Sequence, residues 1–133
     1  MKAIRLLLLL SLFSIPYLSS AQCKTWNDLE IKDELENDYV LYRSYLLTGE
    51  MAKAYDHWIK IYKVAPGLDG RKRPFLEDGR YMYYELFKQA KEKEERKEMA
   101  EIIVSLYKQE KACFPDETPV PIPAEVLEYI PLE

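Results

Sequence analysis

Residues 49–67, GEMAKAYDHWIKIYKVAPG, decide how the rest of the chain is interpreted. Ala54, Trp58 and Ile61 recur at spacings of four and three, which is the periodicity of one apolar helix face. The glycine that opens the stretch favours a turn, and the proline near its end pushes the preceding residue out of the helical region. The stretch therefore predicts one amphipathic helix over about residues 50–65.

The residues upstream of this stretch predict a preceding helix over residues 27–48, which Asn27 or Asp28 can cap. Its apolar positions, again three and four apart, are Leu29, Ile31, Leu35, Tyr39, Tyr42, Tyr45 and Leu46. Since Gly49 separates the two helices by a short turn, they form a helix-turn-helix pair.

A second pair of helices is predicted after the loop at residues 67–74. Pro74 suits the first turn of the third helix, and the charged run at residues 91–98 marks a turn before the fourth helix at about 95–112. The inward positions expected are Leu76, Tyr81, Tyr84, Leu86, Phe87 and Ala90 in the third helix, and Met99, Ile102, Ile103, Leu106 and Tyr107 in the fourth. No window shows the strict alternation of a half-buried strand, so the predicted fold class is all-α.

Residues 35–68 have the length and punctuation of one 34-residue helix-turn-helix repeat. The stretch resembles the tetratricopeptide family at Leu41, Tyr45, Gly49, Ala54, Trp58 and Pro66. It departs from the family at Tyr42, where glycine is usual, and at Asp38, where a large aromatic residue is usual. Residues 74–113 fit only loosely, with Ala100 and Val104 at positions equivalent to Ala54 and Trp58.

The resemblance implies a short right-handed array of about two helix pairs. The overall pattern, a leader that ends in Ala-Gln followed by these helices, looks like exported tetratricopeptide proteins of Bacteroidetes. Proteins of this family bind peptides on an inner helical surface, so the resemblance implies a protein partner.

The N-terminus has the layout of a secretory signal peptide, which we expect to comprise residues 1–21. Lys2 and Arg5 are basic, residues 6–15 are apolar except for Ser11 and Ser14, and a small residue, Ala21, precedes the expected cleavage site. The apolar stretch is short for a membrane helix, although an uncleaved anchor is the alternative. Cleavage would leave a helical domain at residues 22–114 and a tail at 115–133, in the periplasm or at the cell surface.

Charge and cysteine content restrict the partners. Loss of the two basic leader residues changes the formal net charge from −4 to −6, which disfavours nucleic acid, and no later stretch predicts a transmembrane segment. Cys23 and Cys113 are expected to form a disulfide, as an even cysteine count in an exported protein suggests. Two alternatives are a lipid anchor at Cys23, disfavoured by the preceding Gln22, and free thiols.

Residue patterns for catalysis are scarce. His57 is the only histidine, and after the leader only Ser44 and Ser105 remain as serines. The acidic positions of the first helix fit a solvated face better than a catalytic pair; they are Asp33, Glu34, Glu36 and Asp38. We therefore predict no enzyme activity, no metal site and no cofactor.

The first helix pair and the third helix offer three partner contacts. Tyr39 and Arg43 are four residues apart and are expected to line an inner surface. Three tyrosines so close together in the third helix cannot all share one face; if Tyr81 and Tyr84 are core, Tyr83 points outward. Tyrosine and arginine are favoured in binding surfaces.

The tail predicts a further contact. Alternating prolines at 119–123 favour an extended segment, and a short helix is possible at residues 124–130. Val126, Leu127 and Ile130 would form its apolar side and dock in a groove, either of this domain or of a partner.

Two helix pairs are short for a stable array, for which about three repeats are usual. A disulfide, a docked tail or a partner protein could compensate. The sequence therefore predicts a non-enzymatic adaptor that binds a protein partner in the cell envelope. The alternatives are an obligate structural subunit of an envelope complex and, less favoured, a small-ligand binder or enzyme, which would need a pocket around His57, Asp56 and Glu50.

Overall fold

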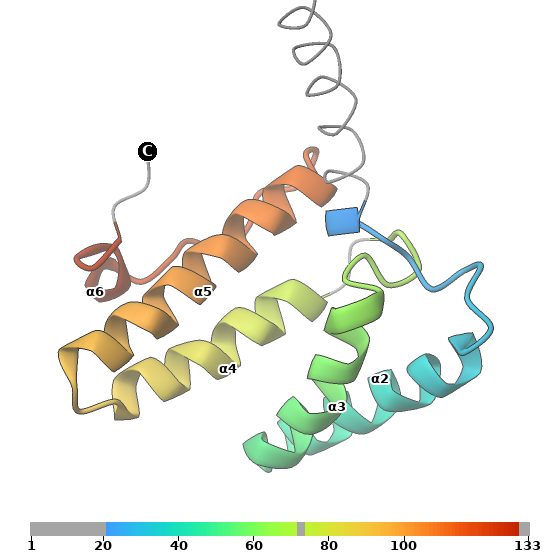
Figure 1. The fold of residues 1–133 in the computed structure, drawn as a ribbon, viewed down its shortest axis with the longest axis horizontal. Helices are drawn as coiled ribbons and strands as arrows, with labels where there is room; N and C mark the ends of the chain where they lie inside the picture. The colour runs from blue at the N-terminus through green and yellow to red at the C-terminus, as the bar shows by residue number, and fades with distance from the viewer. Residues whose placement is uncertain (1–20, 72–73, 131–133) are drawn as a thin grey trace, which may run out of the picture.

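The computed structural model describes residues 21–71 and 74–130, and every regular element in these ranges is a helix (Figure 1). The helices are α2 (Lys32–Leu47), α3 (Met51–Val64), α4 (Phe75–Gln89), α5 (Lys93–Cys113) and α6 (Ala124–Leu127). α2 packs against α3 and α4 against α5, so the chain forms two helix hairpins. The predicted all-α class is confirmed for the described residues, whereas the predicted signal peptide, apart from Ala21, lies outside them.

The predicted start of the first helix at residue 27 is wrong, because α2 begins at Lys32. The segment before α2 is tied to the loop that follows α3. The backbone N–H of Trp26 donates to the carbonyl oxygen of Leu68 at 2.7 Å, and the Asn27 side chain donates to the carbonyl oxygen of Asp69 at 3.2 Å. Since Trp26 is also buried, this long-range pairing replaces the helical capping that local sequence suggested.

The turns match the prediction more closely. Gly49 has a φ of 77°, a left-handed conformation that favours glycine, and it separates α2 from α3. α3 ends at Val64, immediately before the Ala65-Pro66 pair that was expected to terminate it.

Trp58 of α3 joins the two hairpins. Its indole N–H donates to the carbonyl oxygen of Phe75 at 2.9 Å, and its ring stacks near the Phe75 ring, with centroids 5.3 Å apart. Gly79 of α4 lies directly against this indole: a Cβ at that position would sit 2.2 Å from the Trp58 ring. The glycine thus permits the close approach of α4 to α3.

The described residues form two apolar clusters. The first joins the hairpins and contains Trp58, Tyr42 and Phe75, all fully or almost fully buried. The second lies between α4, α5 and the tail. Its buried members are Phe87, Ala100, Ile103, Val104, Ile122 and Val126.

A buried ion pair fixes the second hairpin and the tail to one another. Arg80 Nη2 lies 2.9 Å from Glu110 Oε2, with both side chains less than a tenth exposed. Arg80 Nη1 also donates to the carbonyl oxygen of Val120 at 2.8 Å, and its guanidinium lies over the Tyr107 ring. One arginine therefore connects α4, α5 and the tail.

The expected disulfide between Cys23 and Cys113 is present. In this structure the Cys23 sulfur is therefore neither a free thiol nor the attachment point of a lipid. The disulfide joins the N-terminal segment to the end of α5 across a sequence separation of 90 residues. None of the described helices combines the length and the apolar character needed to cross a bilayer.

Candidate functional site

Tyr39 and Arg43, predicted as partner contacts, are engaged within the chain. Tyr39 is half-buried, with its ring edge-on to Trp26 and Tyr42. Arg43 Nη1 lies 2.7 Å from Asp78 Oδ2, an ion pair that links α2 to α4. Arg43 therefore helps to hold the hairpins together, whereas Tyr39 packs α2 against the segment that precedes it.

The predicted order of exposure among the α4 tyrosines is reversed. Tyr81 is 50% exposed, and Tyr83, which was expected to point outward, is half-buried against α3. The reason is Gly79: it brings α4 so close to Trp58 that the face carrying Gly79 and Tyr83, which are four residues apart, turns toward the first hairpin. Tyr83 therefore lies at the junction of the hairpins.

The tail docks on its own domain. Val126 is fully buried, and Leu127 and Ile130 pack against the same cluster on α4 and α5. Of the two alternatives for the tail, the structure has the intramolecular one, and contact of Val126 with a partner is not possible in this conformation. Figure 1 shows α6 on the far side of α5 from α3, so the tail lies apart from the first hairpin.

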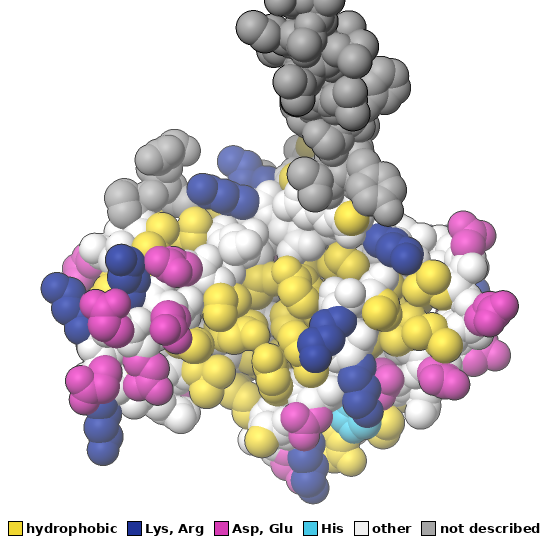
Figure 2. Space-filling view, viewed as in Figure 1, with side chains coloured by type: hydrophobic (Ala, Val, Ile, Leu, Met, Phe, Trp, Pro, Cys, Tyr) yellow, Lys and Arg dark blue, Asp and Glu magenta, His cyan; other side chains and the backbone are white. Residues whose placement is uncertain are grey.

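A different set of residues forms the most extended apolar surface on the face seen in Figure 2, where hydrophobic side chains gather across the middle of the molecule. We call this surface the apolar band. Its partly exposed members are Tyr55, Ile59 and Tyr62 of α3, Tyr83 of α4 and Ile102 of α5. All five pack on the first core cluster, so the band is the uncovered edge of the core between the hairpins.

The hydroxyl groups of the band are paired with one another or with α5. Tyr55 Oη and Tyr83 Oη are 3.0 Å apart, and Tyr62 Oη donates to Gln109 Oε1 at 2.8 Å. Burial, together with the hydrogen bond to Tyr55, raises the pKa of Tyr83 above its usual range; burial also raises the pKa of Tyr62. The hydroxyls of Tyr62 and Tyr83 are therefore uncharged at neutral pH, and these tyrosines present mainly their rings.

A pocket of about 470 Å³ opens at one end of the band. Ile59, Tyr62, Val64 and Pro66 supply its apolar walls, and Lys24 and Lys63 lie at its edge. We call it the lysine-flanked pocket. Basic side chains border the apolar band on the α3 side in Figure 2, and Lys60, with its side chain 60% exposed, belongs to the same edge of α3.

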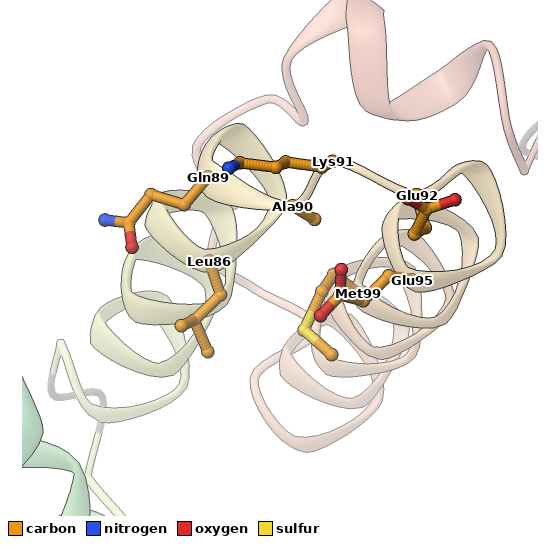
Figure 3. Close-up of a pocket in the computed structure, with 7 residues that line it drawn as sticks. All are labelled: Leu86, Gln89, Ala90, Lys91, Glu92, Glu95 and Met99. Carbon is orange, nitrogen blue, oxygen red and sulfur yellow. The ribbon is translucent and has the colours of Figure 1, made fainter.

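A second hollow, also of about 470 Å³, lies at the turn between α4 and α5 (Figure 3). Leu86 and Met99 point into it from the two helices, and its rim carries Lys91, Glu92 and Glu95. The three charged side chains are exposed, and the hollow lacks the buried, convergent polar groups that a specific small-ligand site uses.

His57 takes part in a polar contact on the first hairpin. Its Nδ1 lies 2.6 Å from Asp38 Oδ1, and its ring stacks on Tyr45. Glu50, which was considered as part of a pocket around His57, instead pairs with Lys53 at 2.8 Å. Within the described residues, no group of three or more metal-ligating side chains is close enough to hold a metal ion.

Sequence reasoning missed the apolar band although its signal was present. Tyr55, Ile59 and Tyr62 are spaced i, i+4 and i+7, which places them on one side of α3. This stripe runs beside the buried stripe of Ala54 and Trp58, so α3 is apolar over more of its circumference than one hairpin partner can cover.

Comparison with known proteins adds no relative: no family model matches the chain, and neither a curated protein nor a solved structure matches it.

Proposed function

We propose that this protein is a non-enzymatic interaction protein of the cell envelope, and that the apolar band is its contact surface for a protein partner. One observation carries the proposal: five partly exposed apolar side chains from three helices form a continuous surface whose tyrosine hydroxyls are already hydrogen-bonded. A partner that covers this surface has at most one tyrosine O–H to pair, and each polar group left unpaired would cost about 1–3 kcal/mol.

The composition of the band supports a protein partner. Three of its five members are tyrosines, which are enriched in the buried centres of protein interfaces. The disulfide is consistent with an oxidising compartment outside the cytoplasm. The two hairpins are consistent with the tetratricopeptide-like array that we propose as the architecture.

Crosslinking in cells that make the protein tests the function. A photoreactive residue would replace Ile59 in the band, and a matched one would replace Lys97, an exposed position on α5. We expect Ile59 to crosslink reproducibly to one envelope protein and Lys97 not to do so. Equal crosslinking from both positions, or recovery of the monomer alone, would contradict the proposal.

The second candidate function is that of an obligate structural subunit. It is favoured by the outer face of α2, where Val40 is 64% and Leu47 is 80% exposed. An obligate subunit buries its apolar face permanently and is unstable alone. If the purified protein aggregates, and Leu47→Ser prevents this while Ile59→Ser does not, the subunit function is supported in place of the adaptor.

A further inference from the structure

The geometry of the apolar band indicates which kind of protein segment fits it. Tyr55, Ile59 and Tyr62 span two turns of α3, roughly 10 Å. Tyr83 of α4 and Ile102 of α5 pack on the same core cluster, so both hairpins contribute side chains to the band. Side chains at i, i+4 and i+7 form a ridge, and a second helix packs against such a ridge with its own anchors at the same spacing.

The hydrogen bonds of the tyrosine hydroxyls indicate whether a helical or an extended partner segment suits the band better. An extended peptide has unpaired backbone carbonyls and needs donors on the surface that binds it. Here one hydroxyl of the Tyr55–Tyr83 pair donates to the other and the Tyr62 hydroxyl donates to Gln109, so the three tyrosines leave a single O–H donor unused, fewer than an extended peptide needs. A helix satisfies its backbone internally and needs no such donor. The band is therefore suited to a helix.

The charges around the band indicate the flanks of that helix. The chain is acidic overall, with 23 Asp and Glu against 19 Lys and Arg. Nevertheless Lys24 and Lys63 flank the pocket at the end of the band, and none of the described residues that line this pocket is Asp or Glu. Lys60 lies on the same helix, 3.9 Å from Asp38 and largely exposed. This local basic edge would attract acidic side chains and repel basic ones.

We infer that the apolar band binds an amphipathic helix of a partner protein, with apolar anchors at i, i+4 and i+7 and acidic residues on its flanks. One large anchor of that helix occupies the lysine-flanked pocket, and its acidic flank faces Lys60 and Lys63. This inference rests on the proposed function and adds to it the secondary structure and the charge of the partner segment.

The test uses the full mature protein and three fluorescent synthetic peptides of about 18 residues, because isolated helices shorter than about 12–15 residues are marginal in water. All share leucines at i, i+4, i+7 and i+11. The first has glutamates on its flanks, the second has lysines there, and the third is the acidic peptide with a central proline that breaks the helix. Binding is measured by fluorescence anisotropy at low and at physiological salt.

We expect the acidic peptide to bind at least about tenfold more tightly than the basic one, and salt to reduce this difference. The proline peptide should lose binding. The double variant K60E/K63E should reverse the charge preference, while the matched control K97E should leave it unchanged. Both sets of substitutions are at exposed lysines, so the fold is preserved.

The inference would be overturned by no binding of the acidic peptide, by equal binding of the acidic and basic peptides, by undiminished binding of the proline peptide, or by self-association of the protein through the band. Binding to phosphatidylglycerol vesicles that K60E/K63E abolishes, without peptide binding, would assign the surface to membranes and would also overturn it. If crosslinking from position 59 still captures one envelope protein, the proposed function stands and only the helical, acidic partner is wrong.

Discussion

The two ends of the helical stack differ in what covers them. At the second hairpin, the outer face of α4 and α5 is apolar, and the tail covers it with Ile122 and Val126. At the first hairpin, the outer face of α2 has no such cover among the described residues, and Leu47 lies 80% exposed there. The chain thus closes one end of its stack with its own C-terminal segment and leaves the other end open.

This difference follows from the residues on each face. The covered face includes Phe87, Ile103 and Val104, which together would expose a large apolar area without the tail. The outer face of α2 alternates its few apolar residues with acidic and polar ones, among them Glu36 and Ser44. Covering the face at the second hairpin therefore removes a large apolar area from water, whereas the outer face of α2 has less apolar area to bury.

Removal of the disulfide is expected to have the largest effect, because it holds the open and the closed halves in one unit. C23S, or reduction of the native protein, should lower the free energy of unfolding by about 4–5 kcal/mol, since the closed loop spans nearly the whole domain. Urea unfolding with and without reductant measures this. A change below about 1 kcal/mol would show that the hairpins hold together without the crosslink.

The buried ion pair should be nearly as important at the closed end. R80M should cost about 2–4 kcal/mol, because it removes the hydrogen bonds that Arg80 donates to the Glu110 carboxylate and to the carbonyl oxygen of Val120. The double variant R80M/E110L should lose less stability than the sum of the losses in R80M and E110L, because the two side chains interact directly. If the two losses simply add in urea unfolding, the contact between Arg80 and Glu110 does not account for them.

A matched pair of substitutions compares the two ends directly. V126D places a carboxylate in a fully buried site and should release the tail, at a cost of about 3 kcal/mol or more. L47D, at the open end, should stay within about 0.5 kcal/mol of the native protein. Thermal unfolding and gel filtration of both variants measure the contrast, and equal destabilisation would mean that α2 is covered as well.

The smallest effect expected is a pH dependence at the link between the hairpins. Burial raises the pKa of Asp78, while hydrogen bonds from Arg43 and Tyr42 lower it, and the net pKa lies above its usual value of 3.8. The folded state therefore holds this proton more tightly than the unfolded state, so the contribution of Asp78 to stability increases as pH falls through the raised pKa. Relative to D78N, the native protein should gain stability between pH 7 and pH 4. A difference that is constant with pH would contradict this assignment.

Much of the fold could be predicted from local patterns. The periodicity around Trp58, the turn at Gly49 and the stop before Pro66 placed α3 within one or two residues, because each signal acts over a few residues. The disulfide followed from the cysteine count. The start of α2 was wrong because Trp26 pairs with Leu68, and such a long-range contact leaves no local signal.

The candidate site could be predicted less well. Tyr81 was expected in the core but is exposed, because the orientation of α4 depends on the contact of Gly79 with Trp58, which links residues 21 positions apart. Docking of the tail on its own domain was predicted only as one of two alternatives. The apolar spacing around Val126 is the same whether the tail binds its own domain or another protein. The α3 members of the band, Tyr55, Ile59 and Tyr62, have a helical spacing that the sequence shows. Its members from α4 and α5 could be identified only from the packing of the two hairpins.

Hydrogen–deuterium exchange on the protein alone and in complex with its crosslinked envelope partner tests the central claim most directly. The account predicts slower exchange in the complex for peptides that cover residues 55–62 and 99–109, and unchanged exchange for residues 33–47. Protection confined to residues 33–47 would contradict it, because the partner would then cover the open end of the stack and not the apolar band.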